Sequence, residues 1–231
     1  MRQDIEFNGT IASDLMLLVQ EEISAPSPKP KYEKYDISGR DGDMIVSGGH
    51  YDDIQITVPF NYTEYGDWGN TYRNAKRWLN AKGSQKLKLS RMDNYFYIVK
   101  RVEIGNEKRS VAHAGSFEVV FVCDPYTYLE SGLIELSAGE LYNANALSHP
   151  KYMITGNGSC TLTVNGKTMT AVVGQNMTID TDRMIAYRVD GTMMNTSVSG
   201  DYEELYLQPG ENTLSITDGF ELKIIPNWRC L

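Results

Sequence analysis

Hydrophobic and polar residues alternate along several segments of this chain of 231 residues, and a period of two predicts half-buried β-strands. The clearest run is Ile-Gln-Ile-Thr-Val-Pro-Phe at 54–60. It follows a turn-forming segment, Ile-Ser-Gly-Arg-Asp-Gly at 37–42, whose glycines can adopt positive φ. The residues 39–51 are expected to form a loop or a long hairpin tip. Further strands are expected in the first half at 86–90, 95–104 and 116–123, the last ending at Asp-Pro-Tyr 124–126.

One segment of the first half changes to a helical period. We expect this helix to begin with Asn70 as its N-cap and to have Gly83 as its C-terminal stop. A lone amphipathic helix must bury its apolar stripe against a sheet. The stripe is predicted, at spacings of four, three and four, to consist of Trp68, Tyr72, Ala75 and Leu79.

The second half of the chain is predicted to be all-β. Short strands recur about every ten residues with turn chemistry between them, which is typical of a β-sandwich. Asn165-Gly166 is the strongest hairpin signal, Gly156-Asn157-Gly158 and Gly174 are expected to be turns, and residues 205–207 a strand. The predicted domains are therefore 1–130 and 131–231.

Composition narrows the class of protein. Hydrophobic residues make up 41% and charged residues 23% of the chain, which are globular proportions. The net charge of −8 argues against a surface that binds nucleic acid. Because the chain has no apolar stretch near 18 residues and no signal-peptide core, we expect no membrane span and folding in a cytoplasm.

No catalytic, cofactor-binding or metal site is predicted. Carboxylate pairs such as Asp41 with Asp43 lack the converging ligands of a calcium site. Tyr202 and Tyr206 suggest either a platform for sugar rings or, with more weight, packing in a core or interface. No nucleophile or acid lies near the three histidines in a recognisable catalytic pattern; they are His50, His113 and His149. The three cysteines are widely spaced and are expected to be small buried hydrophobes; they are Cys123, Cys160 and Cys230.

With these elements in place, the whole chain resembles the distal tail protein (Dit) family of bacteriophages with long non-contractile tails and of related prophages. Short, non-catalytic motifs carry the resemblance. They are Phe-Asn-Gly at 7–9, the 37–42 segment, Gly-His-Tyr at 49–51, the 117–126 block and the closing Ile-Ile-Pro-Asn-Trp-Arg at 224–229.

The resemblance implies a mainly β fold, with a tail-tube-like split-barrel domain and one helix at 1–130 and a galectin-like β-sandwich at 131–231. It implies a structural protein, not an enzyme, that forms a hexameric ring with a central channel at the phage tail tip. The ring would join the tail tube protein to the tail-associated (Tal) and receptor-binding proteins. It would be assembled in the bacterial host cytoplasm, and the genome would pass without specific binding. The alternative is a carbohydrate-binding, lectin-like module, and a cell-wall hydrolase is less favoured.

A hairpin between positions 39 and 51 is suited to reach a neighbouring subunit. We therefore expect the oligomer interface to include Gly39, Arg40, Asp41, Gly42, His50 and Tyr51. Replacing Arg40 or Asp41 with Ala is expected to weaken ring assembly more than folding.

Overall fold

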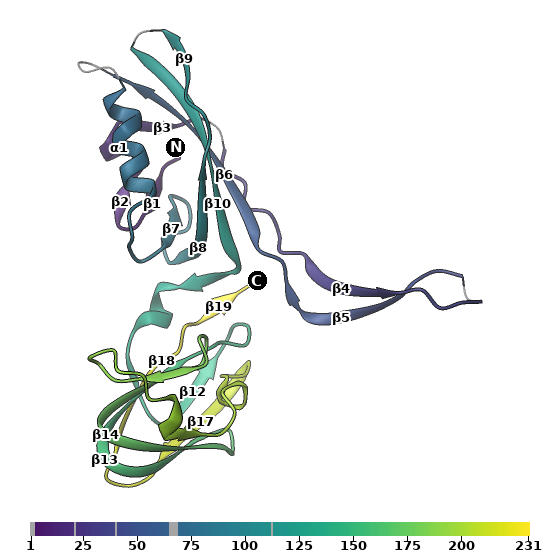
Figure 1. The fold of residues 1–231 in the computed structure, drawn as a ribbon, viewed down its shortest axis with the longest axis vertical. Helices are drawn as coiled ribbons and strands as arrows, with labels where there is room; N and C mark the ends of the chain where they lie inside the picture. The colour runs from purple at the N-terminus through teal and green to yellow at the C-terminus, as the bar shows by residue number, and fades with distance from the viewer. Residues whose placement is uncertain (1–2, 21, 40, 65–68, 112) are drawn as a thin grey trace. The chain divides into compact units, whose positions relative to one another are not determined.

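Strands prevail in the computed structural model, which confirms the expected mainly β fold with a helix in the first half (Figure 1). The chain divides into two units, Met1–Thr127 with Leu231, and Tyr128–Cys230. The division lies near the expected domain boundary, while the ring-forming and galectin-like assignments stay predictions. The structure describes residues 3–20, 22–39, 41–64, 69–111 and 113–231.

The first unit is built on one large sheet whose strands lie in the order β2, β1, β7, β8, β10, β6 and β3, with β9 also paired to β10. A short 3-10 turn, η1 (Ala12–Leu15), separates β2 from β3. The strands are β1 (Ile5–Phe7), β2 (Thr10–Ile11), β3 (Leu17–Val19), β6 (Ile54–Thr63), β7 (Lys86–Leu89), β8 (Tyr95–Ile104), β9 (Lys108–Val111) and β10 (Ala114–Leu129).

The alternating pattern of 54–60 places one face of β6 in the core. Every second residue of β6, from Ile54 to Tyr62, is buried, and the residues between them are exposed or half-buried. β10 pairs antiparallel with β6, and this register sets Phe117 opposite Phe60 on the buried face. On the opposite face of the two strands where they pair, which we call the open face, the residues are exposed or half-buried except Val122, which is buried.

β10 continues past the point where the sequence was expected to end it. Asp124, Pro125 and Tyr126 lie within β10, which runs to Leu129. The pairing of β10 with β6 already ends at Cys123. Pro125, which has no N–H group, therefore removes no hydrogen bond from this pair of strands.

The helix α1 (Asn70–Leu79) follows β6 and packs on the sheet with Ala75, Trp78 and Leu79 buried. The expected limits were wrong at both ends: the N-cap is Gly69, with φ of +77°, and the C-cap is Asn80. Gly69 has no capping side chain of its own, so another residue supplies the acceptor, as described below. The predicted helix residue Trp68 lies outside the described residues.

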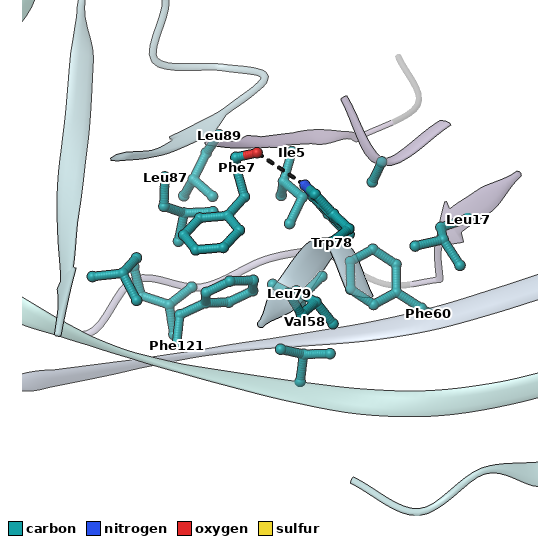
Figure 2. Packing of buried hydrophobic residues seen from close by; sticks show 14 of the residues in the cluster. Ile5, Phe7, Leu17, Val58, Phe60, Trp78, Leu79, Leu87, Leu89 and Phe121 are labelled. Atoms are coloured by element: carbon teal, nitrogen blue, oxygen red, sulfur yellow. Dashed lines mark hydrogen bonds between the residues drawn. The ribbon is translucent and has the colours of Figure 1, made fainter. Parts of the chain in front are cut away.

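Aromatic side chains from distant segments meet in the core of the first unit (Figure 2). The ring of Phe7 lies 5.3 Å from that of Phe121 and 6.1 Å from that of Trp78, measured between centroids. The Trp78 indole Nε1–H also donates a hydrogen bond of 2.9 Å to the backbone carbonyl of Phe7. This bond fixes the helix to β1.

The second unit contains a sheet in the order β11, β18, β13, β14 and β15, extended by β16 on β14 and by β17, which pairs with β12 and β13. Its core is a separate hydrophobic cluster. The strands are β11 (Leu136–Ser137), β12 (Glu140–Asn143), β13 (Lys151–Val164), β14 (Lys167–Asp180), β15 (Ile185–Tyr187), β16 (Val198–Ser199), β17 (Gly210–Ile216), β18 (Glu221–Ile225) and β19 (Arg229–Cys230), and the 3-10 turns are η2 (Glu130–Leu133), η3 (Asn195–Ser197) and η4 (Glu203–Leu205).

A long hairpin of β13 and β14 dominates the second unit. Asn165 and Gly166 have φ of 51° and 79°, as a type I′ turn requires, which confirms the predicted hairpin. The turns expected at 156–158 and at Gly174 are wrong, because both segments lie inside paired strands. These glycines make room for side chains instead: Phe220 lies against Gly156, and Arg188 lies over Gly174.

The strand expected at 205–207 is also wrong. Leu205 ends the 3-10 turn η4, and Leu207 forms only an isolated bridge with Ser148. Both leucines are fully buried, and the Leu205 carbonyl accepts a 2.6 Å hydrogen bond from the Tyr152 hydroxyl. The apolar spacing marked a core segment, but the chain there bends around the Tyr152 side chain.

Candidate assembly surface

A two-stranded ribbon separates from the large sheet of the first unit. It consists of β4 (Pro30–Tyr35) and β5 (Met44–Tyr51), which pair only with each other. Figure 1 shows the ribbon standing clear of the other elements of the first unit. We call residues 30–51 the arm. Every described arm residue is exposed except Tyr51, which is half-buried.

The base of the arm is fixed by polar and aromatic contacts. The Asp52 amide donates to the Lys29 carbonyl at 2.9 Å, which closes the ribbon. The Lys100 ammonium lies 2.6 Å from Asp53 and 3.1 Å from Asp124, and so links the end of the arm to β8 and β10. The Tyr51 ring meets Tyr126 edge-on at 6.1 Å. The arm is therefore held at one end and free at the other.

The predicted interface residues lie at the two ends of the arm. Gly39 and Gly42, with φ of 86° and 81°, shape its turn, and Asp41 is exposed between them. His50 and Tyr51 lie at its base, where the His50 ring covers Gly48. Arg40 lies outside the described residues. Their role in an interface stays a prediction.

Sequence reasoning missed the residues that make the arm unusual. Large apolar side chains stand in solvent along both strands. The signal was present as three consecutive apolar residues, 44–46, between glycine-rich and polar segments, but without a fold nothing showed that the run stays uncovered. The exposed fractions are Tyr32 55%, Tyr35 50%, Met44 44%, Ile45 59% and Val46 40%.

A buried carboxylate supplies the missing cap of α1. Glu64 is 4% exposed, and its oxygens accept hydrogen bonds from the amides of Gly69 at 2.8 Å and Thr71 at 2.9 Å. Arg109 donates to it at 3.0 Å and to Glu107 at 2.9 Å. The Thr71 amide first, and the Gly69 amide and Arg109 after it, outweigh burial and lower the pKa of Glu64 to about 2. Glu64 is thus a structural cap rather than a catalytic acid.

The histidine with the most partners is in the second unit. His149 Nδ1 lies 3.1 Å from an Asp182 oxygen, and its Nε2 lies 2.9 Å from Nη2 of Arg229. Because a carboxylate only accepts and a guanidinium only donates, Nδ1 carries the proton and Nε2 accepts. The ring stacks on Tyr206 at 4.1 Å. Both ring nitrogens are therefore occupied within the fold, and neither is placed to take a proton from a substrate.

The tyrosines considered as a sugar platform also take part in packing. Tyr202 packs against the core of the second unit, and burial raises the pKa of its hydroxyl. Tyr206 is stacked on His149. Both side chains are half-buried, and sugar binding by them stays a prediction.

A broad hollow of about 950 Å³ lies on the open face of β6 and β10, bounded by the segment 20–26 and by the turn from β8 to β9. Among its described lining residues are three carboxylates, Glu22, Glu103 and Glu118, and one ammonium, Lys108. Its surface is polar, and two of these carboxylates are ion-paired, Glu22 with Arg91 at 2.5 Å and Glu103 with Arg101 at 2.7 Å. This is the open face of the strands whose other face forms the core.

The structure also bears on the predictions made for the cysteines, for a membrane span and for a metal site. Cys123 and Cys160 are buried, as expected for small hydrophobes, and Cys230 is half-buried. No helix in the described part of the chain is long and apolar enough to cross a membrane. Within the same ranges, no group of three or more His, Cys, Asp or Glu residues could hold a metal ion.

The fold of this chain is similar to that of a solved protein structure. No family model and no curated protein sequence matches the chain. Among solved structures, the chain is similar to the Dit protein (gp 19.1) of SPP1, described as a paradigm of the hub adsorption apparatus in phages that infect Gram-positive bacteria. The TM-score is 0.69 at 17% sequence identity, over 97% of this chain and 98% of that one. Both units therefore share the fold of that hub protein.

Proposed function

We propose that this chain is a structural hub protein of a phage tail tip, of the distal tail type, and that it acts as a hexameric ring. The fold shared with SPP1 Dit over nearly the full length of both chains supports this proposal. The observation that carries the ring itself is the arm. A two-stranded ribbon without further contacts is only marginally stable in water. The row of exposed Tyr, Ile, Met and Val side chains on the arm therefore indicates a surface that is covered in the assembled protein.

The ring joins the tail tube protein on one side to the tail-associated protein on the other, and the second unit carries receptor-binding proteins. The protein resides in the virion and is assembled in the host cytoplasm. Its role is structural, and DNA passes the channel unbound. The Glu118 carboxylate in the hollow supports this last point, because a carboxylate repels the phosphate backbone. We propose the open face of β6 and β10 as part of the channel wall.

The ring is tested with the purified full chain. Light scattering coupled to size exclusion should give the mass of a hexamer at high protein concentration, and electron microscopy should show rings. A variant in which a short Gly-Ser turn replaces residues 33–46 removes the outer arm without touching either core. It should remain folded by circular dichroism and stay monomeric. A parent chain that is monomeric at every concentration overturns the proposal.

Lectin activity is the alternative to exclude. A glycan array and calorimetric titration with the parent chain should show no saccharide binding. A clear signal that is lost in Tyr206→Ala would replace the hub proposal for the second unit.

A further inference from the structure

The two faces of the arm differ in chemistry. The register of β4 and β5 pairs Glu33 with Val46 and Tyr35 with Met44, so these four side chains share one face, which we call face A. The intervening pairs, Lys34 with Ile45 and Tyr32 with Ser47, form the other face, face B. Each face combines exposed apolar side chains with one central charged residue, and Lys31, nearer the base of the arm, is paired with Asp52 at 3.3 Å.

The central charges are opposite. On face A, Glu33 accepts a hydrogen bond from the Tyr35 hydroxyl, which holds the carboxylate against that face. On face B, Lys34 makes no ion pair with any residue the structure describes. The two residues are neighbours in sequence and project to opposite sides of the ribbon. One arm thus presents an apolar surface with an anion on one side and an apolar surface with a cation on the other.

We propose that the arms of neighbouring copies stack on each other, face A of one copy on face B of the next. This inference rests on the proposed ring, and it names the contact that closes it. In this stack Glu33 of one copy meets Lys34 of the next, and Tyr35, Met44 and Val46 cover Tyr32 and Ile45.

Charge complementarity selects this arrangement over stacking of like faces. Two A faces bring Glu33 near its copy, and two B faces do the same for Lys34, and like charges in an interface are unfavourable. Pairing of unlike faces is a head-to-tail contact, which leaves one free A face and one free B face at the ends of any open row. Such a row ends only by closing into a ring. Every apolar face of every arm is then buried.

Charge reversal tests the stack in the full chain. Glu33→Lys and Lys34→Glu should each raise the protein concentration needed for half-assembly by about tenfold or more, measured by light scattering across a dilution series. The double variant Glu33→Lys with Lys34→Glu exchanges the two charges in every copy. Each A–B contact again contains one anion and one cation, so assembly should return to within about threefold of the parent.

Glu221→Lys and Lys82→Glu are matched controls, because they make the same charge changes at exposed positions outside the arm. They should assemble like the parent. Single arm variants that assemble normally, or a double variant that stays as weak as the singles, overturn the stack while the ring stands. A parent chain that never assembles overturns the ring and the stack together. Circular dichroism of each variant checks that folding is unchanged.

Discussion

At the scale of single residues, the most consequential side chains are buried polar groups whose partners the sequence did not reveal. Glu64 closes the first turn of α1 from a position before the helix, and Arg229 fixes His149 from the last strand. Both act across turns or long sequence separations, so their partners could not be read from local spacing. Each is a satisfied group whose loss leaves other buried groups unpaired.

Glu64 should make the stability of the first unit depend on acid. Its pKa is lowered to about 2 from an ordinary value of 4.5, chiefly by the Thr71 amide. A carboxylate with a lowered pKa contributes stability that is complete above its ordinary pKa and is lost as the pH falls toward 2. Glu64→Gln should therefore lower the melting temperature at pH 7, and the difference from the parent should shrink between pH 4.5 and pH 2.

Thermal unfolding followed by circular dichroism across this pH series measures the effect, with Glu221→Gln as an exposed control. If the difference in melting temperature between Glu64→Gln and the parent stays constant from pH 7 to pH 2, the charge of the carboxylate does not stabilise the helix cap.

At the scale of elements, α1 is held less by its own sequence than by the sheet beneath it. Its ten residues are short for a helix that must be stable alone, so packing of Ala75, Trp78 and Leu79 supplies the stability. The Trp78 indole reaches across the core to the Phe7 carbonyl (Figure 2). The helix and β1 should therefore unfold together.

Trp78→Phe should destabilise the first unit by about 1–3 kcal/mol, because it removes a buried donor and part of a ring that contacts Phe7 and Phe60. Hydrogen exchange of the backbone amides measures the loss of stability in each unit separately. Amides of β1 and α1 should exchange faster, while those of β13 and β14 in the second unit serve as an internal control. Equal acceleration in both units would contradict a local effect.

At the scale of the whole molecule, charge distribution matters more than net charge. Most of the −8 lies in the second unit, where residues 128–230 hold 12 acidic and 6 basic side chains. In the first unit, the hollow on the open face of β6 and β10 carries Glu22 and Glu103, which are paired with Arg91 and Arg101, together with Glu118. If this face lines the channel of the proposed ring, each carboxylate is repeated by symmetry around the path of the DNA. One substitution in the sequence then changes the channel wall in every copy of the ring.

Glu118→Lys should turn a non-binding ring into one that retains double-stranded DNA at low salt, and the retention should fall steeply as salt increases. A gel-shift titration against salt measures it. Glu221→Lys makes the same charge change in the second unit and should bind DNA no better than the parent. Equal retention by the two variants would place Glu118 away from the channel.

Taken alone, the sequence determined the parts of this protein that local physics controls. Alternation fixed the buried face of β6, helical spacing located α1, and Asn165-Gly166 fixed the hairpin turn, since side-chain period and positive φ are properties of neighbouring residues. It also placed Gly39, Asp41 and Gly42 in a turn, but residues 44–51, expected to belong to the same loop or hairpin tip, form the strand β5.

Only the tertiary structure decided what depends on which segments meet. Glycines at 156 and 158 lie in a strand because Phe220 and β14 are there, and Glu64 caps a helix because Arg109 and two amides converge on it. The exposure of Tyr32, Ile45 and their neighbours was likewise invisible in the sequence, where an apolar run looks the same whether covered or bare. Burial is a relation between distant parts of a chain, so it is settled only when the chain is folded.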